Sequence, residues 1–194
     1  HGETQSQNLL LIRIQKGGSY KIGYINTLGK IVIPPRFEEA WDYSEGLAPV
    51  RIKNKWGYID ETGNMIIKPQ FNHVSPFKEG LAAVTSSTKS EIWGYIDKTG
   101  RYAIEPKYDV ALNFSNGLAR VVTHDKKRIY IDKKGKQMFV RDPFAEDFFD
   151  GLAMFKTLGN TPGSKIGYLN KEGKIVIEAK YEGGTQFAEG LACV

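Results

Sequence analysis

Carboxylate residues recur along this chain at two positions whose spacing could support acid–base chemistry. The first set is Asp60, Asp97 and Asp132, and the second set is Glu45, Glu79, Asp150 and Glu189. A glycosidase needs two carboxyl groups about 5–10 Å apart, on opposite sides of the sugar bond that it cleaves. The two recurring carboxylates are therefore the first candidates for catalysis.

Asparagine replaces the carboxylate at both positions, and this argues against catalysis. Asn26 and Asn170 stand in the first set, and Asn116 stands in the second. An asparagine side chain can accept hydrogen bonds from the N–H groups of a turn, but it cannot act as an acid or a nucleophile. Both positions also lie shortly before a glycine. We therefore predict that both sets cap turns.

No other residues of the chain form a recognisable catalytic or metal-binding motif. The three histidines, His1, His73 and His124, stand in unrelated contexts, and no zinc-protease, phosphate-loop or nucleophile-elbow motif is present. The single cysteine, Cys193, excludes an intramolecular disulfide and a cysteine-based zinc site. The sequence thus predicts a protein that is not an enzyme and that has no cofactor and no metal site.

The residues around these positions form two phrases that recur five times. The first phrase is IGYIN (22–26), WGYID (56–60), WGYID (93–97), RIYID (128–132) and IGYLN (166–170). The second is EGLA or a close variant at 45–48, 79–82, 116–119, 150–153 and 189–192. Successive glycines of the second phrase are 34, 37, 34 and 39 residues apart. A period of this length is typical of a repeat protein, whose units bury their cores against one another.

Each copy is expected to contain three short strands, which in the second copy are residues 47–52, 55–60 and 64–69. The Asp-Glu-Thr-Gly sequence that ends at Gly63 suits a tight hairpin turn, and Pro69 is expected to stop the third strand because it has no N–H group. The glycines in mid-strand, Gly57 and Gly94, mark places where another backbone comes close. The predicted fold is all-β, a tandem array of about five three-stranded β-meander repeats.

The predicted array covers residues 9–194, and residues 190–194 repeat the start of a first strand, as a sixth copy would. Both ends of the chain therefore carry a first strand of the repeat, since residues 9–14 are also expected to form one. This favours an open solenoid-like array over the alternative, a closed five-bladed propeller-like ring. Residues 1–8 are polar and are expected to be a disordered linker or a processed N-terminus.

The phrases KWGYIDETG (55–63) and WGYIDKTG (93–100), together with EGLA, resemble the bacterial WG-repeat family, also called KWG repeats. Ile22 and Ile166 replace the tryptophan of the pair in two copies, and Arg128-Ile129 replaces both residues in a third. The resemblance implies a β-rich repeat module of bacterial proteins, many of which are exported or surface-associated. It favours an extracytoplasmic location, periplasmic or surface-associated, over a cytoplasmic one, and it implies no catalytic residues.

Differences in length between the copies fall at one hairpin tip, between the first and second strands. The longer tips are QKGGSYK (15–21), SSTKSE (86–91) and KTLGNTPGS (156–164). Insertions on one face of a repeat protein often mark its binding face. We therefore predict a binding or scaffold module with contacts at Ser19, Tyr20, Lys89 and Asn160.

The alternative is a lectin-like module in which an exposed aromatic ring stacks on a sugar, and Trp41 is its best candidate because it lies outside the repeated phrases. The expected partner is a protein or a surface polysaccharide. The net charge of +5 is too modest to indicate nucleic acid. No apolar run approaches the roughly 20 residues that span a bilayer, so membrane insertion is not expected.

Overall fold

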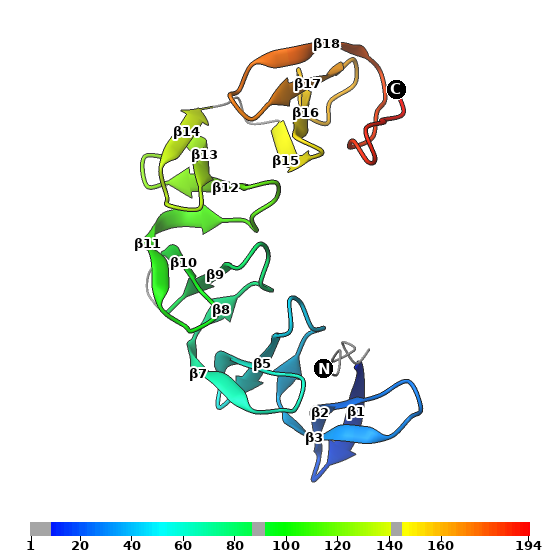
Figure 1. Cartoon of the computed structure of the whole chain (residues 1–194), viewed down its shortest axis with the longest axis vertical. Coiled ribbons are helices and arrows are strands. Elements are labelled where there is room, and N and C mark those ends of the chain that lie inside the picture. Colours follow the sequence, from blue (N-terminus) through cyan, green and yellow to red (C-terminus); the bar gives the residue numbers. More distant parts are fainter. Residues whose placement is uncertain (1–8, 87–91, 141–144) are drawn as a thin grey trace, which may run out of the picture. The chain divides into compact units, whose positions relative to one another are not determined.

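The computed structural model describes residues 9–86, 92–140 and 145–194, and these segments form strands and loops without any helix (Figure 1). The all-β prediction is therefore confirmed. None of the described residues forms a helix of the length and apolar character that a membrane crossing requires. The predicted N-terminal linker, residues 1–8, lies outside the described residues. The chain divides into two compact units, unit 1 (1–106) and unit 2 (107–194).

Unit 1 contains the three-stranded antiparallel sheet β1-β2-β3, the four-stranded sheet β4-β5-β6-β7, and strands β8-β9-β10-β11 of a seven-stranded sheet. Neighbours in the chain are neighbours in each sheet. The strands are β1 (Leu10–Lys16), β2 (Ser19–Ile25), β3 (Ile31–Phe37), β4 (Glu39–Ala40), β5 (Ala48–Ile52), β6 (Lys55–Ile59), β7 (Met65–Phe71), β8 (His73–Val74), β9 (Ala82–Thr85), β10 (Trp93–Ile96) and the first half of β11 (Tyr102–Ala111).

Unit 2 contains the second half of β11 with β12-β13-β14, which belong to the same seven-stranded sheet, and the four-stranded sheet β15-β16-β17-β18. The strands are β12 (Leu118–Thr123), β13 (Arg128–Asp132), β14 (Gln137–Val140), β15 (Ala145–Phe149), β16 (Leu152–Lys156), β17 (Ile166–Asn170) and β18 (Ile175–Tyr181). Every sheet is a linear order of strands, and none closes into a barrel among the described residues.

The predicted meander of three strands is present in each copy, and a short strand from the preceding copy joins most of them. In unit 1, Ala40 of β4 pairs with Val50 of β5, and Val74 of β8 pairs with Val84 of β9. Two-residue strands are too short to show the alternation of apolar and polar residues that predicts a strand. This fourth strand was therefore missed in the sequence.

The prediction that Pro69 ends the third strand was wrong, because β7 continues through it to Phe71. Trp56 pairs with Phe71 and Tyr58 pairs with Ile67, so that residues 68–70 bulge opposite Gly57 alone. Proline is tolerated at a bulge because its position has no ladder hydrogen bond to donate. The same shift of register, around Gly23 and Gly167, occurs in the first and last copies.

The bulge explains the glycine in mid-strand. A Cβ atom built on Gly57 would lie 2.3 Å from the carbonyl oxygen of Ile67 and 2.8 Å from the nitrogen of Pro69. Gly23, Gly94 and Gly167 meet the equivalent carbonyl at 2.3–2.6 Å. The predicted close approach of another backbone is thus confirmed, and the glycine and the proline belong to one local structure.

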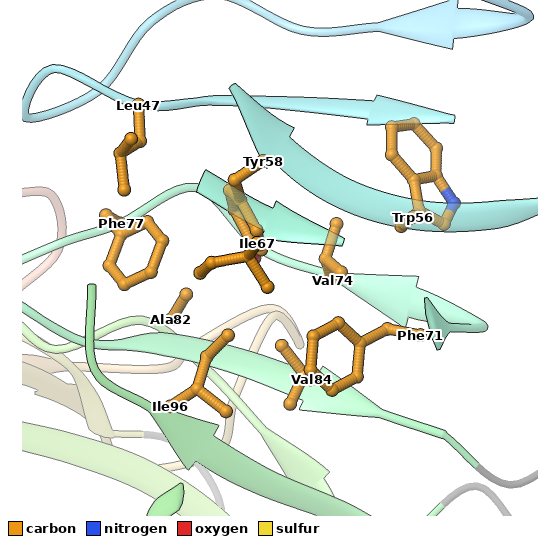
Figure 2. Packing of buried hydrophobic residues seen from close by; sticks show 10 residues of the cluster. All are labelled: Leu47, Trp56, Tyr58, Ile67, Phe71, Val74, Phe77, Ala82, Val84 and Ile96. Atoms are coloured by element: carbon orange, nitrogen blue, oxygen red, sulfur yellow. The ribbon is translucent and has the colours of Figure 1, made fainter. Parts of the chain in front are cut away.

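The core consists of clusters that join one copy to the next, and Figure 2 shows one of them. Tyr58, Ile67 and Phe71 of the second copy pack with Ala82 and Ile96 of the third, and all five side chains are buried. Large aromatic and branched side chains opposite a small alanine allow two sheets to approach closely. The recurring aromatic and alanine residues therefore stabilise the contact between copies.

The tyrosine of the GYID phrase has a second function besides apolar packing. Its hydroxyl donates a hydrogen bond to a main-chain carbonyl 16 or 17 residues further along the chain. The pairs are Tyr24 to Trp41 (2.8 Å), Tyr58 to Ser75 (2.8 Å), Tyr130 to Glu146 (2.6 Å) and Tyr168 to Thr185 (2.7 Å). A phenylalanine would fill the same space but would leave a carbonyl of the connecting loop without this donor.

Candidate functional site

The first set of recurring carboxylates caps the turn after the second strand, as predicted. In all five copies one side-chain oxygen accepts hydrogen bonds from the backbone N–H groups two and four residues further on, at 2.8–3.2 Å. The capping residues are Asn26, Asp60, Asp97, Asp132 and Asn170. Asparagine and aspartate perform the same task here, which explains why they interchange.

The second set does not cap its own turn, and that part of the prediction was wrong. Its side chains instead reach the backbone N–H of the equivalent glycine in the next copy: Glu45 accepts from Gly80 (3.0 Å) and Asp150 accepts from Gly190 (2.9 Å). Asn116 accepts from Gly151 in the same way, at 3.1 Å. These three residues therefore link successive copies, a role that requires an acceptor and no proton transfer.

The pKa values of these carboxyl groups agree with a structural role. Burial opposes ionisation of Asp60, but hydrogen bonds from Thr62 and Asn64 outweigh burial and lower its pKa. Hydrogen bonds from Thr99 and Arg101 likewise lower the pKa of Asp97. A general acid at neutral pH needs a raised pKa. Across the described residues, no group of three or more His, Cys, Asp or Glu is placed to hold a metal ion.

The first hairpin tip presents an aromatic residue paired with a cation. Ser19 and Tyr20 begin β2 and are exposed, and Ser19 pairs with Lys16 across the turn. The Arg13 guanidinium lies 4.0 Å from the centre of the Tyr20 ring, so that these two side chains cover each other on one face of the hairpin. Lys89, the contact predicted in the third copy, lies outside the described residues.

Trp41 follows β4 in unit 1 and is 37% exposed. Its ring centre lies 5.0 Å from that of the buried Trp56, at an interplanar angle of 53°. Its backbone is fixed by two hydrogen bonds, because its N–H donates to Pro49 and its carbonyl accepts from Tyr24. Part of an aromatic ring is thus held at the surface on a rigid support.

The tip of the last copy borders an open cavity of about 570 Å³. We call this the tip cavity. It is formed by the ends of β16 and β17, the loop between them and residues 182–184, all in unit 2. Among its lining residues are the buried Met154 and Ile166, the exposed Asn160, and the two lysines Lys156 and Lys165.

The loop around the tip cavity is ordered by its own hydrogen bonds. The Leu158 N–H donates to the Ser164 hydroxyl, the Thr161 hydroxyl donates to the Leu158 carbonyl, and the Lys165 N–H donates to the Thr157 hydroxyl. These bonds fix the positions of the groups that line the cavity. The insertion in the last copy is therefore a formed structure.

Polar side chains at the tip cavity are arranged in two pairs. The Lys156 ammonium donates to the side-chain oxygen of Asn160 at 2.8 Å, and the Lys165 ammonium lies 2.9 Å from a carboxylate oxygen of Glu182. The Lys165 ammonium lowers the pKa of Glu182. The predicted contact Asn160 thus lies at the tip cavity.

Sequence reasoning missed most of the residues around this cavity. The lysines were unremarkable among the 27 basic residues of the chain. A signal was nevertheless present, because Gly183-Gly184 occupies the position of Glu39-Ala40 in the first copy and His73-Val74 in the second. The last copy thus departs from the repeat at two of the segments that border the cavity, the loop and residues 183–184.

Comparison with known proteins agrees with the repeat geometry. A family model described as a WG containing repeat matches residues 22–56, 56–86, 93–126 and 166–194. No curated protein matches the chain.

Two solved structures share the fold. The computationally designed Ika8 protein is 14% identical, with a TM-score of 0.52 over 92% of this chain and 62% of that one. BamB from Moraxella catarrhalis is 12% identical, with a TM-score of 0.50 over 94% of this chain and 61% of that one. The chain spans less than two thirds of either structure, and the likeness at these identities concerns the fold alone.

Proposed function

This chain belongs to the family of WG-containing repeat proteins, and we propose that it is a non-catalytic binding or scaffold module for protein–protein or cell-envelope interactions. In this proposal the repeated residues stabilise the array and the irregular hairpin tips contact the partner. One observation supports it above the others: the longest insertion among the described tips borders a cavity, whereas the repeated carboxylates serve turns and copy-to-copy contacts.

A comparison of two tips within the chain supports this division. In the second copy, the tip is the two residues Lys53 and Asn54, and their N–H groups donate to the Glu38 carboxylate at 2.9 and 3.0 Å. The N–H groups of that tip are thus already bonded to a side chain of the preceding copy. The tip at residues 158–164 in the last copy is longer by five residues, and the hydrogen bonds of Leu158, Thr161 and Ser164 stay within it, so that its outer face is left for a partner.

The test is a binding experiment with a shortened tip. In the variant, residues 158–164 are replaced by the Lys-Asn tip of the second copy, and far-ultraviolet circular dichroism and a thermal melt check its fold. We expect the wild-type protein to sediment with purified bacterial cell walls and the shortened variant to lose most of this binding. A Leu158→Ala variant, altered at an exposed side chain of the same loop, controls for a change of sequence alone.

Equal sedimentation of the wild-type protein and the shortened variant would contradict a role of this tip. Absence of binding by the wild-type protein to both cell walls and any protein partner would contradict the module as a whole. Turnover of a substrate that is lost on changing one carboxylate, with the fold intact, would make the protein an enzyme.

A lectin-like function is the second candidate, and the exposed ring of Trp41 favours it. Trp56 supports one side of this ring, so that a sugar could stack on the rest without ordering a mobile side chain. On a glycan array, binding by the wild-type protein that is lost in Trp41→Ala and kept in Tyr20→Ala would assign the interaction to Trp41. Retention of the hits in Trp41→Ala would exclude this ring as the contact.

A further inference from the structure

The tip cavity carries an excess of positive charge that the protein itself does not neutralise. Two ammonium groups, of Lys156 and Lys165, line it together with one carboxylate, of Glu182. Lys156 is bonded to the neutral amide of Asn160, so its charge has no counter-ion there. Lys165 is paired with Glu182, whose side chain is 89% exposed. An exposed pair of this kind contributes little stability, and an incoming anion can replace the carboxylate.

The tip cavity also offers main-chain hydrogen-bond donors. Gly159, Gly163, Gly183 and Gly184 line it, and within the described part of the chain their N–H groups have no acceptor. Gly159 is a buried residue, Gly184 is half-buried, and Gly163 and Gly183 are exposed. Because glycine has no side chain, the oxygen atoms of a ligand can come close to these groups. These main-chain N–H donors favour a ligand with several oxygen atoms that accept hydrogen bonds.

The size and polarity of the tip cavity narrow the class of ligand. A volume of about 570 Å³ lies within the range of about 300–1,000 Å³ typical of small-molecule sites. The apolar lining side chains that the structure describes are Met154, Pro162 and Ile166, and no aromatic ring is among them. A peptide would lack a deep apolar pocket for an anchoring side chain, and a neutral sugar would lack a ring on which to stack. An acidic sugar can bind through its anionic group and its hydroxyl groups, without a deep apolar pocket or an aromatic ring.

We propose that the tip cavity of the last copy binds an acidic sugar unit, with Lys156 and Lys165 on its anionic group and the glycine N–H groups on its hydroxyl oxygens. This deepens the proposed function, on which it rests, by naming the ligand class of one hairpin tip. The shared chemistry is an anionic oxygen group on a polyhydroxylated ring, and this group is either a carboxylate or a phosphate.

The test is a titration of the full chain with small ligands. Calorimetry measures the affinity, and the NMR chemical shifts of the glycine amides report whether the ligand lies at the tip cavity. The probes are glucuronate, galacturonate and glucose 6-phosphate, with glucose, acetate and inorganic phosphate as comparisons. We expect binding of at least one acidic sugar that is at least about tenfold tighter than binding of glucose or of the free anions. The uronates and the sugar phosphate together decide which anionic group the site takes.

Three substitutions sharpen the test. Lys156→Gln and Lys165→Gln are each expected to weaken binding about tenfold, the value of one charge-assisted hydrogen bond. Glu182→Gln is expected to tighten it several-fold, because it removes the carboxylate that competes for Lys165. Lys174→Gln, with the same change of charge at an exposed position outside the cavity, is the matched control and should leave binding unchanged.

Two outcomes would overturn the inference: no acidic sugar binds more tightly than glucose, or Lys174→Gln weakens binding as much as the cavity variants do. Neither outcome touches the proposed function. The binding of the wild-type protein to cell walls, and its loss on shortening the tip, are measured separately and can hold when the acidic sugars do not bind.

Discussion

Replacing Gly57 with alanine is the most direct perturbation of the repeat unit. The added Cβ would lie 2.3 Å from the Ile67 carbonyl oxygen and within 3.0 Å of two more main-chain atoms, Pro69 N and Lys68 C. An ordinary carbon–oxygen contact is about 1 Å longer, and main-chain atoms of a bulge cannot turn aside as a side chain can. We therefore expect Gly57→Ala to destabilise unit 1 by about 3 kcal/mol or more.

Gly46→Ala is the matched control for this experiment. Gly46 has a φ angle of +83°, and a Cβ there would meet no atom within 4 Å. The substitution therefore causes only the strain of a left-handed conformation, about 1 kcal/mol. The comparison separates steric contact with the bulge from the general effect of losing a glycine.

The assay is denaturant unfolding followed by tryptophan fluorescence. All three tryptophans of the chain, Trp41, Trp56 and Trp93, belong to unit 1, so the signal reports on the unit that contains Gly57. A Gly57→Ala protein that unfolds at the same denaturant concentration as the wild type, or that is more stable than Gly46→Ala, would refute the account of the bulge. It would mean that β6 and β7 can move apart at the bulge with little loss of folding free energy.

Three further predictions concern the recurring polar contacts. Tyr58→Phe removes the hydroxyl that bonds to the Ser75 carbonyl and should destabilise unit 1 by about 1–2 kcal/mol in the same assay. Glu45→Ala leaves the Gly80 N–H without its acceptor and should cost about 1 kcal/mol, whereas Glu45→Gln should restore most of this. The folded-state pKa of Asp60 is lowered, so its contribution to stability is present above its unfolded pKa of about 3.9 and is lost as the pH falls through the folded value. Asp60→Asn should therefore match the wild type at pH 7 and lose less stability between pH 5 and pH 2, as urea titrations at each pH would show.

Features that depend on residues close in the sequence were predictable. The five copies, their three strands and the caps at Asp60 and Asp97 follow from local patterns, because a strand alternation or a turn signal is complete within a few residues. The close approach at Gly57 was also predicted, since few other reasons place a glycine in mid-strand.

Features that depend on the relation between copies were not predictable. Glu45 and Gly80 are 35 positions apart, and nothing in either local sequence says that one side chain reaches the other backbone. The error at Pro69 has the same origin, because whether a proline ends a strand depends on the register of the neighbouring strand. Local rules describe a residue's conformation, whereas these contacts follow from how two sheets meet.

The hairpin tips were predictable only in part. Their length variation pointed to Asn160, but the tip cavity also needs Lys156, Lys165 and Gly183-Gly184, which come from three segments of the last copy. No single segment is unusual enough to mark a site. The stronger signal is that two segments of one copy depart from the repeat, the loop insertion and Gly183-Gly184. Both segments line the same cavity, so one site accounts for both changes.

The repeated architecture itself gives a reason for the proposed placement of recognition at a tip. A substitution at Tyr58 affects a core that two copies share, and one at Gly57 affects the bulge of its own copy, so these positions cannot change without loss of stability. The residues of the loop between β16 and β17 make their hydrogen bonds within the loop and to its own hairpin, so the loop can change in length and chemistry while the sheets keep their packing. Binding specificity can therefore differ between members of such a family at the tips, while the same phrases continue to build the array.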